Sequence, residues 1–332
     1  MALCARVASN VLTNRALKRK IFFRADASSE IGYGHFIRTL ALADMLKDDF
    51  ECVFYSQAPS EYQRKECEKV CRLVGLPADD SRFQLFLDGL QGDEIVVLDN
   101  YFYTTEYQKA IKNKGCSLVC VDDMHDKHYV ADVVINHGPV TKDEFDCEPY
   151  TKLFLGDDYK LLRRPFLAPI SNRKRNYSAV VNLGGADPFK LTDKVVSLLL
   201  QADTGYHIIV ILGDTVFLSK ENREKVEVRS KLSAEQMADL FETSAFGILP
   251  GSTVSIEAMS RALPILMGYQ ADNQEEGYYK LSNSGLFIPL GNLHKLNLEV
   301  LQEAIELLKS FKPHRLETSH ISNNFKNIFN AL

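Results

Sequence analysis

The segment around His35 combines a histidine with two glycines in a pattern that suits chemistry at a helix start. His35 follows Gly32 and Gly34, after the first expected strand and before the first expected helix. At a helix N-terminus the dipole disfavours the imidazolium and leaves a neutral imidazole that can accept a proton. His35 could therefore act as a general base for water, cap the helix, or donate a hydrogen bond to a ligand. Ile37 stands where the third glycine of a dinucleotide fingerprint belongs, which disfavours a nicotinamide-type Rossmann site.

A second glycine-rich turn follows an expected strand in the second half of the chain. Gly184 and Gly185 allow the backbone to approach a ligand closely, and the free amides of a helix start suit a phosphate group. The same sequence also fits an ordinary turn, in which Asp187 caps the helix and Pro188 occupies its first position. Both interpretations stay open on these residues alone.

Two later segments repeat this arrangement. Ser252 and Thr253 can cap a helix while their hydroxyls and amides face an anion. Glu257 comes one turn later and could accept both hydroxyls of a ribose, although a capping or solvated glutamate is an equal alternative. The side-chain amides of Asn273 and Gln274 could bind sugar or diphosphate oxygens, or could simply cap the helix that they begin.

Two further histidines, His125 and His128, lie among acidic residues and superficially suggest a metal site. The pair lacks another ligand at a spacing that is typical of metal centres, which favours a polar loop. We therefore expect neither a metal ion nor a cofactor.

The composition limits the kind of scaffold that positions these residues. A chain of 332 residues exceeds what one hydrophobic core usually supports, so two domains are expected. Its 45% hydrophobic and 25% charged residues exclude a disordered chain, a collagen-like repeat and a coiled coil. A net charge of −5 disfavours nucleic acid as a partner, and no apolar run approaches the ~18 residues of a membrane span. The odd, scattered set of cysteines indicates reduced thiols, so we expect a cytoplasmic protein. We also expect a monomer without a membrane partner.

The first twenty residues contain several basic residues and no acidic one. Organelle presequences have such a composition, but it also fits a disordered extension or an upstream start codon. We treat residues 1–20 as an N-terminal extension outside the folded domains.

Short β-branched runs alternate with amphipathic stretches along the chain, which predicts an α/β protein with parallel sheets. In the first half, strands are expected at 20–23, 52–55, 95–99, 117–122 and 133–136, and helices at 36–47, 61–74 and 105–113. In the second half, strands are expected at 179–183, 207–212, 246–249 and 264–267, and helices at 191–200, 234–242, 254–260, 273–281 and 298–311.

These elements predict two Rossmann-like domains that face each other across a cleft. The expected boundaries are an N-terminal domain at 21–165, a polar linker at 166–176 and a C-terminal domain at 177–332. Ligands bind at the carboxyl ends of the strands in open parallel sheets, and the polar and glycine-rich segments fall at those ends.

Taken in chain order, these segments resemble the UDP-sugar hydrolases of pseudaminic acid biosynthesis. Those enzymes are related in fold to the two-domain GT-B glycosyltransferases, including the peptidoglycan N-acetylglucosamine transferase. The likeness covers roughly residues 21–290, and its most specific part is the segment around His35. The matching stretches are 23–43, 98–101, 121–123, Asn136, 161–166, 184–187, 251–257 and 271–274.

The resemblance implies roles for some of the matching positions. His35 corresponds to the histidine that activates water in this family. The positions that correspond to the UDP-binding face of this family are Gly184, Gly185, Ser252, Thr253 and Glu257. Those that correspond to polar positions near the sugar are Asp26, Asp99, Tyr101 and Asp123. The substrate-binding set that we expect is Arg24, Asp26, Gly34, Asp99, Tyr101, Asp123, Gly184, Gly185, Asp187, Lys190, Ser252, Thr253, Glu257, Asn273 and Gln274. Two positions depart from the family pattern, because Asn100 stands where histidine is common and Lys190 where asparagine is usual.

The resemblance thus implies a GT-B-like hydrolase of a UDP-linked 2,4-diacetamido-2,4,6-trideoxyhexose. Water activated by His35 would invert the anomeric carbon and release UDP and free sugar, in pseudaminic (nonulosonic) acid biosynthesis. Two alternatives stay open: a GT-B glycosyltransferase that uses a UDP-sugar donor, and a non-catalytic protein that binds nucleotide sugars.

Overall fold

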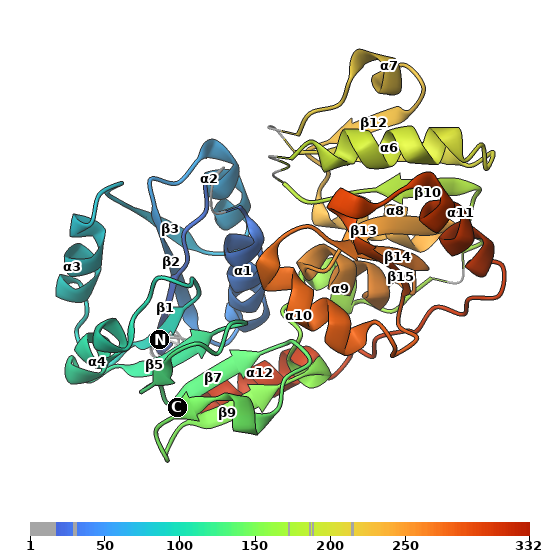
Figure 1. Cartoon of the computed structure of the whole chain (residues 1–332). Coiled ribbons are helices and arrows are strands. Elements are labelled where there is room, and N and C mark those ends of the chain that lie inside the picture. The colour runs from blue at the N-terminus through green and yellow to red at the C-terminus, as the bar shows by residue number, and fades with distance from the viewer. Residues whose placement is uncertain (1–17, 29–31, 172, 186, 188, 214–215) are drawn as a thin grey trace, which may run out of the picture.

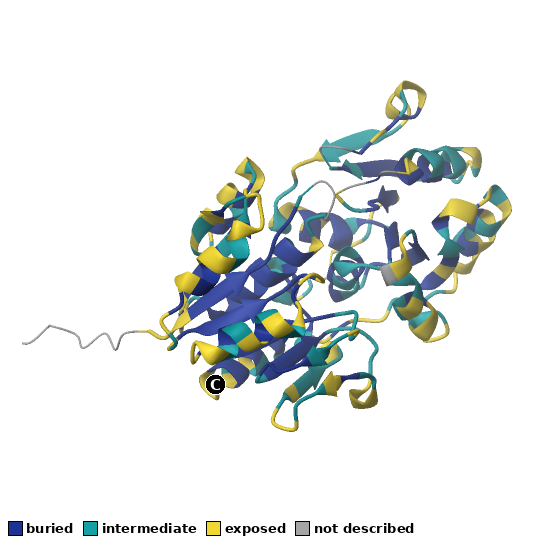
Figure 2. Cartoon of the chain, turned by 60° about the vertical axis from the view of Figure 1, so that its left-hand side comes forward, coloured by how far each residue is buried: buried dark blue, intermediate teal, exposed yellow. Residues whose placement is uncertain are grey.

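The computed structural model describes residues 18–28, 32–171, 173–185, 187, 189–213 and 216–332, except for the side chain of Asn273. The chain forms two bodies, each built on a parallel β-sheet with helices packed against it (Figure 1). Buried residues occupy the central strands of both sheets, whereas exposed residues lie mainly on helices and loops (Figure 2). Apart from its last three residues, the expected extension at 1–20 lies outside the described residues.

The first sheet contains seven parallel strands in the order β3-β2-β1-β4-β5-β7-β9. The sequence of β4, Ile-Val-Val-Leu, is buried along its whole length, as expected for a strand that is covered on both faces. Because β1 lies between β2 and β4, the segments that follow β1 and β4 meet at a topological switch point. The strands are β1 (Lys20–Arg24), β2 (Glu51–Gln57), β3 (Arg72–Leu76), β4 (Ile95–Leu98), β5 (Ser117–Val121), β7 (Val133–Asn136) and β9 (Lys152–Leu155). The other elements are α1 (Gly34–Leu46), α2 (Glu61–Glu68), α3 (Ser81–Asp88), α4 (Thr105–Asn113), β6 (His128–Tyr129), η1 (Lys142–Glu144), β8 (Asp146–Cys147) and η2 (Asp157–Tyr159).

The second sheet contains six parallel strands in the order β12-β11-β10-β13-β14-β15. Its switch point lies between β10 and β13, so the turns that follow those two strands meet in the same way. The strands are β10 (Ser178–Val181), β11 (His207–Leu212), β12 (Glu227–Ser230), β13 (Phe246–Pro250), β14 (Ile265–Tyr269) and β15 (Ile288–Asn292). The helices are α6 (Leu191–Gln201), α7 (Lys220–Arg223), α8 (Ala234–Thr243), α9 (Thr253–Ser260), α10 (Asp272–Leu281), η3 (Leu293–Lys295) and α11 (Leu298–Leu307).

One expected helix is wrong in its second half. The sequence predicted a helix over 61–74, but α2 ends at Glu68 and the chain then forms β3, which pairs with β2. Leu73 and Val74 suit a strand, and Gly75 has a low helix propensity. These residues pair with β2 at the edge of the sheet, so the helical pattern of the residues before them does not continue into 72–76.

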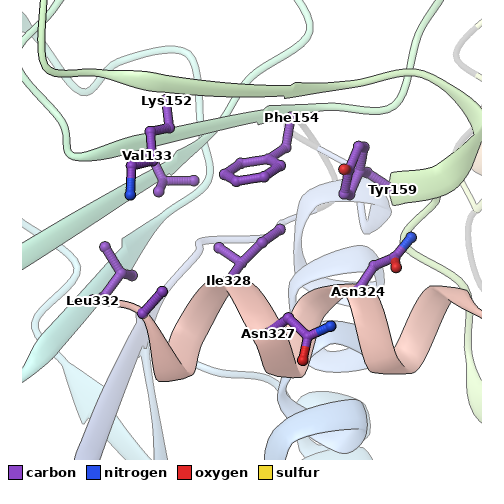
Figure 3. A pocket seen from close by; sticks show the side chains of 9 residues that line it. Val133, Lys152, Phe154, Tyr159, Asn324, Asn327, Ile328 and Leu332 are labelled. Atoms are coloured by element: carbon purple, nitrogen blue, oxygen red, sulfur yellow. The ribbon is translucent and has the colours of Figure 1, made fainter.

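The last helix, α12 (Ile321–Asn330), corrects the C-terminal boundary of the second domain. Residues 177–332 were expected to form that domain, but α12 packs against α1 on the first sheet. Phe325 and Phe329 are fully buried there, and Phe329 lies against Phe50 with ring centroids 6.2 Å apart. A small hollow of about 260 Å³ lies between α12 and the β7–β9 edge, with Phe154 facing Ile328 (Figure 3). The apolar face of α12 is therefore buried by the first domain.

The chain passes between the two domains twice, at neighbouring places. The first passage contains α5 (Arg164–Leu167), and the second follows α11 and leads to α12. Thr318 Oγ1 in the second passage donates to the carbonyl of Leu167 in the first, at 3.4 Å. Arg261 of the second domain donates to the carbonyls of Phe166 and Ala168 at 2.9 and 2.6 Å. Among the described residues, no helix combines the length and apolar character that crossing a bilayer requires.

Candidate functional site

A cleft of about 590 Å³ lies between the carboxyl end of the first sheet and the starts of α9 and α10. It brings together several residues that the sequence predicted, namely Gly34, His35, Tyr101, Asp123, Ser252, Thr253 and Gln274. Other predicted residues are not among the described residues that line it, namely Arg24, Asp26, Asp99, Gly184, Gly185, Asp187, Lys190 and Glu257. The cleft therefore unites the two ends of the predicted site, while part of the predicted set lies behind or beside it.

His35 is the second residue of α1 and lies at the helix N-terminus, where the sequence placed it. Its Nδ1 lies 2.7 Å from Oδ1 of Asp99, the residue that directly follows β4. Its ring meets the ring of Tyr101 edge-on, with centroids 4.6 Å apart, and only 7% of the residue is exposed. An ionised Asp99 can only accept a hydrogen bond, so Nδ1 of His35 carries the proton and donates it to that bond. Nε2 is then the nitrogen of the neutral imidazole that can accept a proton.

Arg38, one turn after His35 on α1, joins two carboxylates. Its Nε and Nη2 donate to Asp99 at 2.7 and 2.6 Å, and its Nη1 donates to Asp123 at 2.8 Å. Burial alone would raise the pKa of Asp99, but the charge of Arg38 holds that pKa well below its usual range. The pKa of Asp123 is lowered in the same way, against burial, by Arg38. Both carboxylates are therefore ionised at neutral pH.

Arg24 and Asp26 form a buried ion pair, with 0% and 1% of the residues exposed. Arg24 Nη2 donates to Asp26 Oδ2 at 2.9 Å. The backbone N–H of Asp26 donates to Oδ1 of Asn100 at 2.7 Å, so Asn100 joins the turns after β1 and β4. These two charged side chains face each other, and their contact with a substrate stays a prediction.

The second domain presents a helix start to the cleft. Ser252 is the N-cap residue of α9, and Thr253 is its first residue. The first amides of a helix lack partners within the helix, so they suit the oxygens of an anion. Gln274 lines the cleft from α10, and its Oε1 accepts from the backbone N–H of Gln270 at 3.1 Å. Asn273 belongs to the same helix, but its side chain lies outside the described residues.

The turn after β10 approaches the first domain. Gly184 has a φ of +106°, which favours glycine. A Cβ at Gly185 would lie 3.6 Å from Cδ2 of Tyr33, which precedes α1. The turns after β1 and β10 therefore face each other across the domain boundary.

Two predicted ligands near this turn have partners within the protein. The Asp187 carboxylate accepts from the backbone N–H groups of Leu191 and Thr192, the first residues of α6, at 2.8 and 2.7 Å. The helix begins three residues later than the capping alternative placed it, and its N-cap residue is Lys190 instead of Asp187. Lys190 Nζ lies 4.6 Å from the centre of the Phe217 ring. Contact of either side chain with a substrate stays a prediction.

Glu257 forms a two-pronged ion pair with Arg163, which precedes α5. Arg163 Nε and Nη2 donate to the two carboxylate oxygens at 2.7 and 2.8 Å. The charge of Glu257 raises the pKa of Arg163 despite its burial. Each carboxylate oxygen has a second lone pair, so this pairing still leaves acceptor capacity for a ribose.

The two histidines that suggested a metal site have different partners. His125 lies near Glu144 and Glu276, and one ligand atom from each of the three falls within 4.8 Å of the others. The ammonium of Lys280 pairs with both of these carboxylates. His128 instead pairs with two other acidic side chains. These ion pairs are those of a polar loop, which the sequence favoured. The pair between Lys280 and Glu144 also joins the two domains.

Several residues that line the cleft are not in the substrate-binding set that was expected from the sequence. Arg38 could have been found, because it lies one turn after His35 on a helix. Asn136 and His137 could also have been found, because they stand at the carboxyl end of an expected strand. Lys160 could not have been found in this way, because it lies outside every strand and helix that was expected from the sequence. The apolar part of the wall consists of Met124, Val140, Ile256, Met259, Met267, Leu281, Leu286 and Leu316.

Two parallel α/β domains with a cleft at their strand ends define the GT-B architecture, and solved structures agree. MurG of Acinetobacter baumannii matches with a TM-score of 0.60 at 11% identity, over 93% of this chain and 99% of that one. HepE of Anabaena in complex with UDP-glucose matches with a TM-score of 0.57 at 12% identity, over 94% of this chain and all of that one. The chain therefore has the GT-B fold that was expected from its sequence.

The sequence comparisons give distant relatives. The UDP-2,4-diacetamido-2,4,6-trideoxy-β-L-altropyranose hydrolase of Campylobacter jejuni is 25% identical over 263 residues, 72% of this chain and 88% of the relative. The spore coat polysaccharide biosynthesis protein SpsG of Bacillus subtilis is 24% identical over 306 residues, 88% of this chain and 89% of the relative. An uncharacterized protein of Methanocaldococcus jannaschii is 26% identical over 78% of this chain, which spans only 57% of that relative's length. No protein-family model matches the chain. The chain is thus a distant homologue of the Campylobacter hydrolase and of SpsG.

Proposed function

We propose that this protein hydrolyses a UDP-linked 2,4-diacetamido-2,4,6-trideoxyhexose to UDP and free sugar, with inversion at the anomeric carbon. The observation that carries the proposal is His35, which is paired with the buried Asp99 and lines one cleft with Ser252 and Thr253 at the helix start. The distant homology to a hydrolase of such a substrate supports the choice of sugar. The structural match to a protein in complex with UDP-glucose supports a nucleotide sugar as the ligand.

The proposed reaction is a single displacement. Water attacks the anomeric carbon from the side opposite UDP, and its proton passes to Nε2 of His35. The bond between the anomeric carbon and the phosphate oxygen breaks, and its electron pair leaves with UDP. Oδ1 of Asp99 lies 2.7 Å from Nδ1 of His35 and accepts its hydrogen bond, which fixes the tautomer that such a base needs. General-base catalysis of this kind contributes about 10²–10⁴-fold to a rate.

The second domain would stabilise the leaving group. The free amides at the start of α9 would meet the negative charge that grows on the diphosphate. Gly184 and Gly185 would admit the diphosphate close to the backbone, and Glu257 would accept the ribose hydroxyls. Arg163 would then keep the Glu257 carboxylate oriented.

Isotope labelling tests the proposal. The purified protein is incubated in H₂¹⁸O with the UDP-diacetamido sugar and no acceptor, and the products are followed by mass spectrometry and NMR. We expect equal amounts of UDP and free sugar, with the label on the anomeric carbon and the first-formed anomer inverted. Label on the phosphate, or the absence of UDP release, would contradict the proposed reaction.

A glycosyltransferase is the second candidate, because the apolar wall formed by Met259, Leu281 and Leu286 could accept an organic acceptor. A transferase would use the same cleft but supply a hydroxyl group in place of water. It would release UDP only after an acceptor is added, whereas the proposed hydrolase needs none. A non-catalytic binding protein would bind the nucleotide sugar and leave it intact under both conditions.

A further inference from the structure

Three buried side-chain atoms at the wall of the cleft lack partners among the described residues, namely Oδ1 of Asp123, Nδ1 of His125 and Nδ2 of Asn136. Oδ1 of Asp123 and Nδ2 of Asn136 are both buried, and neither has a hydrogen-bond partner. Leaving a buried polar atom unpaired costs about 1–3 kcal/mol, so such atoms usually have a ligand or a water molecule as a partner. Both residues line the cleft, and Asn136 is only 1% exposed.

The orientation of the Asn136 amide follows from its other contact. Its Oδ1 accepts from the backbone N–H of Gly138 at 2.6 Å, so the unpaired atom is the Nδ2 donor. Asp123 is ionised, so its unpaired Oδ1 is an acceptor. One unpaired donor and one unpaired acceptor therefore belong to the same wall.

These two residues lie on neighbouring strand ends. Strand β5 pairs with β7, and the N–H of Asp122 donates to the carbonyl of Ile135 at 3.0 Å. Asp123 directly follows Asp122, and Asn136 directly follows Ile135. A ligand that meets one of them therefore lies near the other.

His137 adds a second donor beside Asn136. The backbone N–H of Leu161 lies 3.5 Å from its Nδ1, so the proton of the neutral ring lies on Nε2. Burial, followed by the charges of Arg38 and Lys160, lowers the pKa of His137 to about 3, which keeps the ring neutral. Lys160 Nζ also donates to the carbonyl of His137 and fixes this part of the loop.

We propose that Asp123, Asn136 and His137 form a subsite for an N-acylamino group of the sugar. Asp123 Oδ1 accepts the amide N–H, and Asn136 Nδ2 and His137 Nε2 donate to the acyl oxygen. Met124 and Val140, which line the same cleft, pack against the acyl methyl group. A hydroxyl substituent has neither the length nor the methyl group to use all of these contacts. The inference rests on the proposed sugar-nucleotide ligand but not on its hydrolysis.

Calorimetric titration tests the subsite without turnover. UDP and the UDP-diacetamido sugar are titrated into the His35→Ala protein, or into the parent if the parent leaves the sugar intact. His137→Phe keeps a planar ring and removes the donor, whereas His137→Gln places an amide nitrogen near the position of Nε2. Asn136→Asp keeps the oxygen that binds Gly138 and replaces only the nitrogen.

We expect His137→Phe and Asn136→Asp to weaken binding of the UDP-sugar roughly tenfold while UDP binds as before. His137→Gln should restore most of the affinity, and His207→Phe, which changes a histidine outside the cleft, should have no effect. Analogues in which one acetamido group is replaced by hydroxyl identify the group, because the effect of His137→Phe should vanish for one of them.

Three results would overturn the subsite. They are unchanged UDP-sugar affinity in both His137→Phe and Asn136→Asp, an equal loss for UDP alone, and a full His137→Phe effect on both hydroxyl analogues. The last result would mean that a bound water or another sugar oxygen is the partner. Failure of the proposed hydrolysis would appear separately, as an intact UDP-sugar that still binds in a His137-dependent way.

Discussion

The two walls of the cleft hold their polar groups in different ways. In the first domain, His35, Asp99 and Arg38 form a hydrogen-bonded, buried network without any ligand. In the second domain, the cleft meets the first turn of α9, which begins at Thr253, and the nearby carboxylate of Glu257 is paired with an arginine. The first wall therefore offers oriented side chains, and the second offers mainly the ends of helices.

This difference separates chemistry from binding. Charges that are already in place need no reorganisation during a reaction, which suits the wall where a proton is moved. Helix amides carry partial charges and no titratable proton, so they suit a diphosphate that is held and then released. If this division is correct, substitutions in the two walls should change different measured quantities.

The largest effect is expected for His35→Ala. Removing the base should lower kcat by about 10²–10⁴-fold, because general-base catalysis contributes that much to a rate. The affinity for UDP should change little, since the partner of His35 is water at the sugar. Steady-state kinetics and titration of UDP measure the two quantities, and a near-normal kcat would remove the general-base assignment.

Asp99→Asn should have the next largest effect. The amide keeps the shape of the side chain but can donate to Nδ1 of His35, which favours the wrong tautomer. We expect kcat to fall by about 10²-fold or more, with KM nearly unchanged. A variant whose KM rises while kcat is preserved would instead place Asp99 in substrate binding.

Glu257→Gln tests the opposite wall. The substitution removes one strong, charged acceptor, so UDP affinity should fall roughly ten- to hundredfold, because a hydrogen bond to a charged group contributes about 1.5–3 kcal/mol. Arg163→Met is the matched variant, because it removes only the partner of Glu257. If Glu257→Gln binds UDP like the parent in a calorimeter, the carboxylate serves Arg163 alone.

Acid should reduce the contribution of the Asp123–Arg38 ion pair to the stability of the protein. The pKa of Asp123 is lower in the folded protein than in the unfolded chain, so its contribution to stability is present above about pH 4 and is lost as the pH falls further. The difference in unfolding free energy between the parent and Asp123→Asn should be about 1 kcal/mol at pH 7 and should shrink by pH 3. Thermal denaturation across this range measures it, and a difference that is independent of pH would contradict the ion pair with Arg38.

The smallest expected effect is that of chelation. Lys280 already neutralises Glu144 and Glu276, so EDTA or added Mg²⁺ should leave the rate of UDP release unchanged. Activity assays with and without EDTA provide the measurement. A large, reversible loss of rate would identify His125 and these glutamates as a metal site.

The sequence revealed groups that are local in the chain and missed groups that depend on distant partners. His35, Ser252 and Thr253 were predicted because each follows a strand and begins a helix, and both signals lie within a few residues. The pairing of Glu257 with Arg163, which is 94 residues away, has no local signal. The same holds for α12, whose apolar face is clear but whose destination on the first sheet depends on topology.

Asn136 and His137 show a different limit. The rule that ligands meet strand ends marked their position, and Asn136 belonged to a stretch that resembles the hydrolases. Their possible role became visible only through atoms that lack partners, and a sequence cannot show which hydrogen bonds are unmade. The residues around a site are thus easier to predict than the atoms that are free to bind.

The double passage of the chain between the domains has a mechanical consequence. The two connections are hydrogen-bonded to each other at Thr318 and Leu167, so together they restrict how the domains can move relative to each other. A single connection would let one domain swivel freely, whereas two adjacent ones permit mainly rotation about the line that joins them. We therefore expect the cleft to open and shut along one path, which would return His35 to the same place opposite α9 in every cycle.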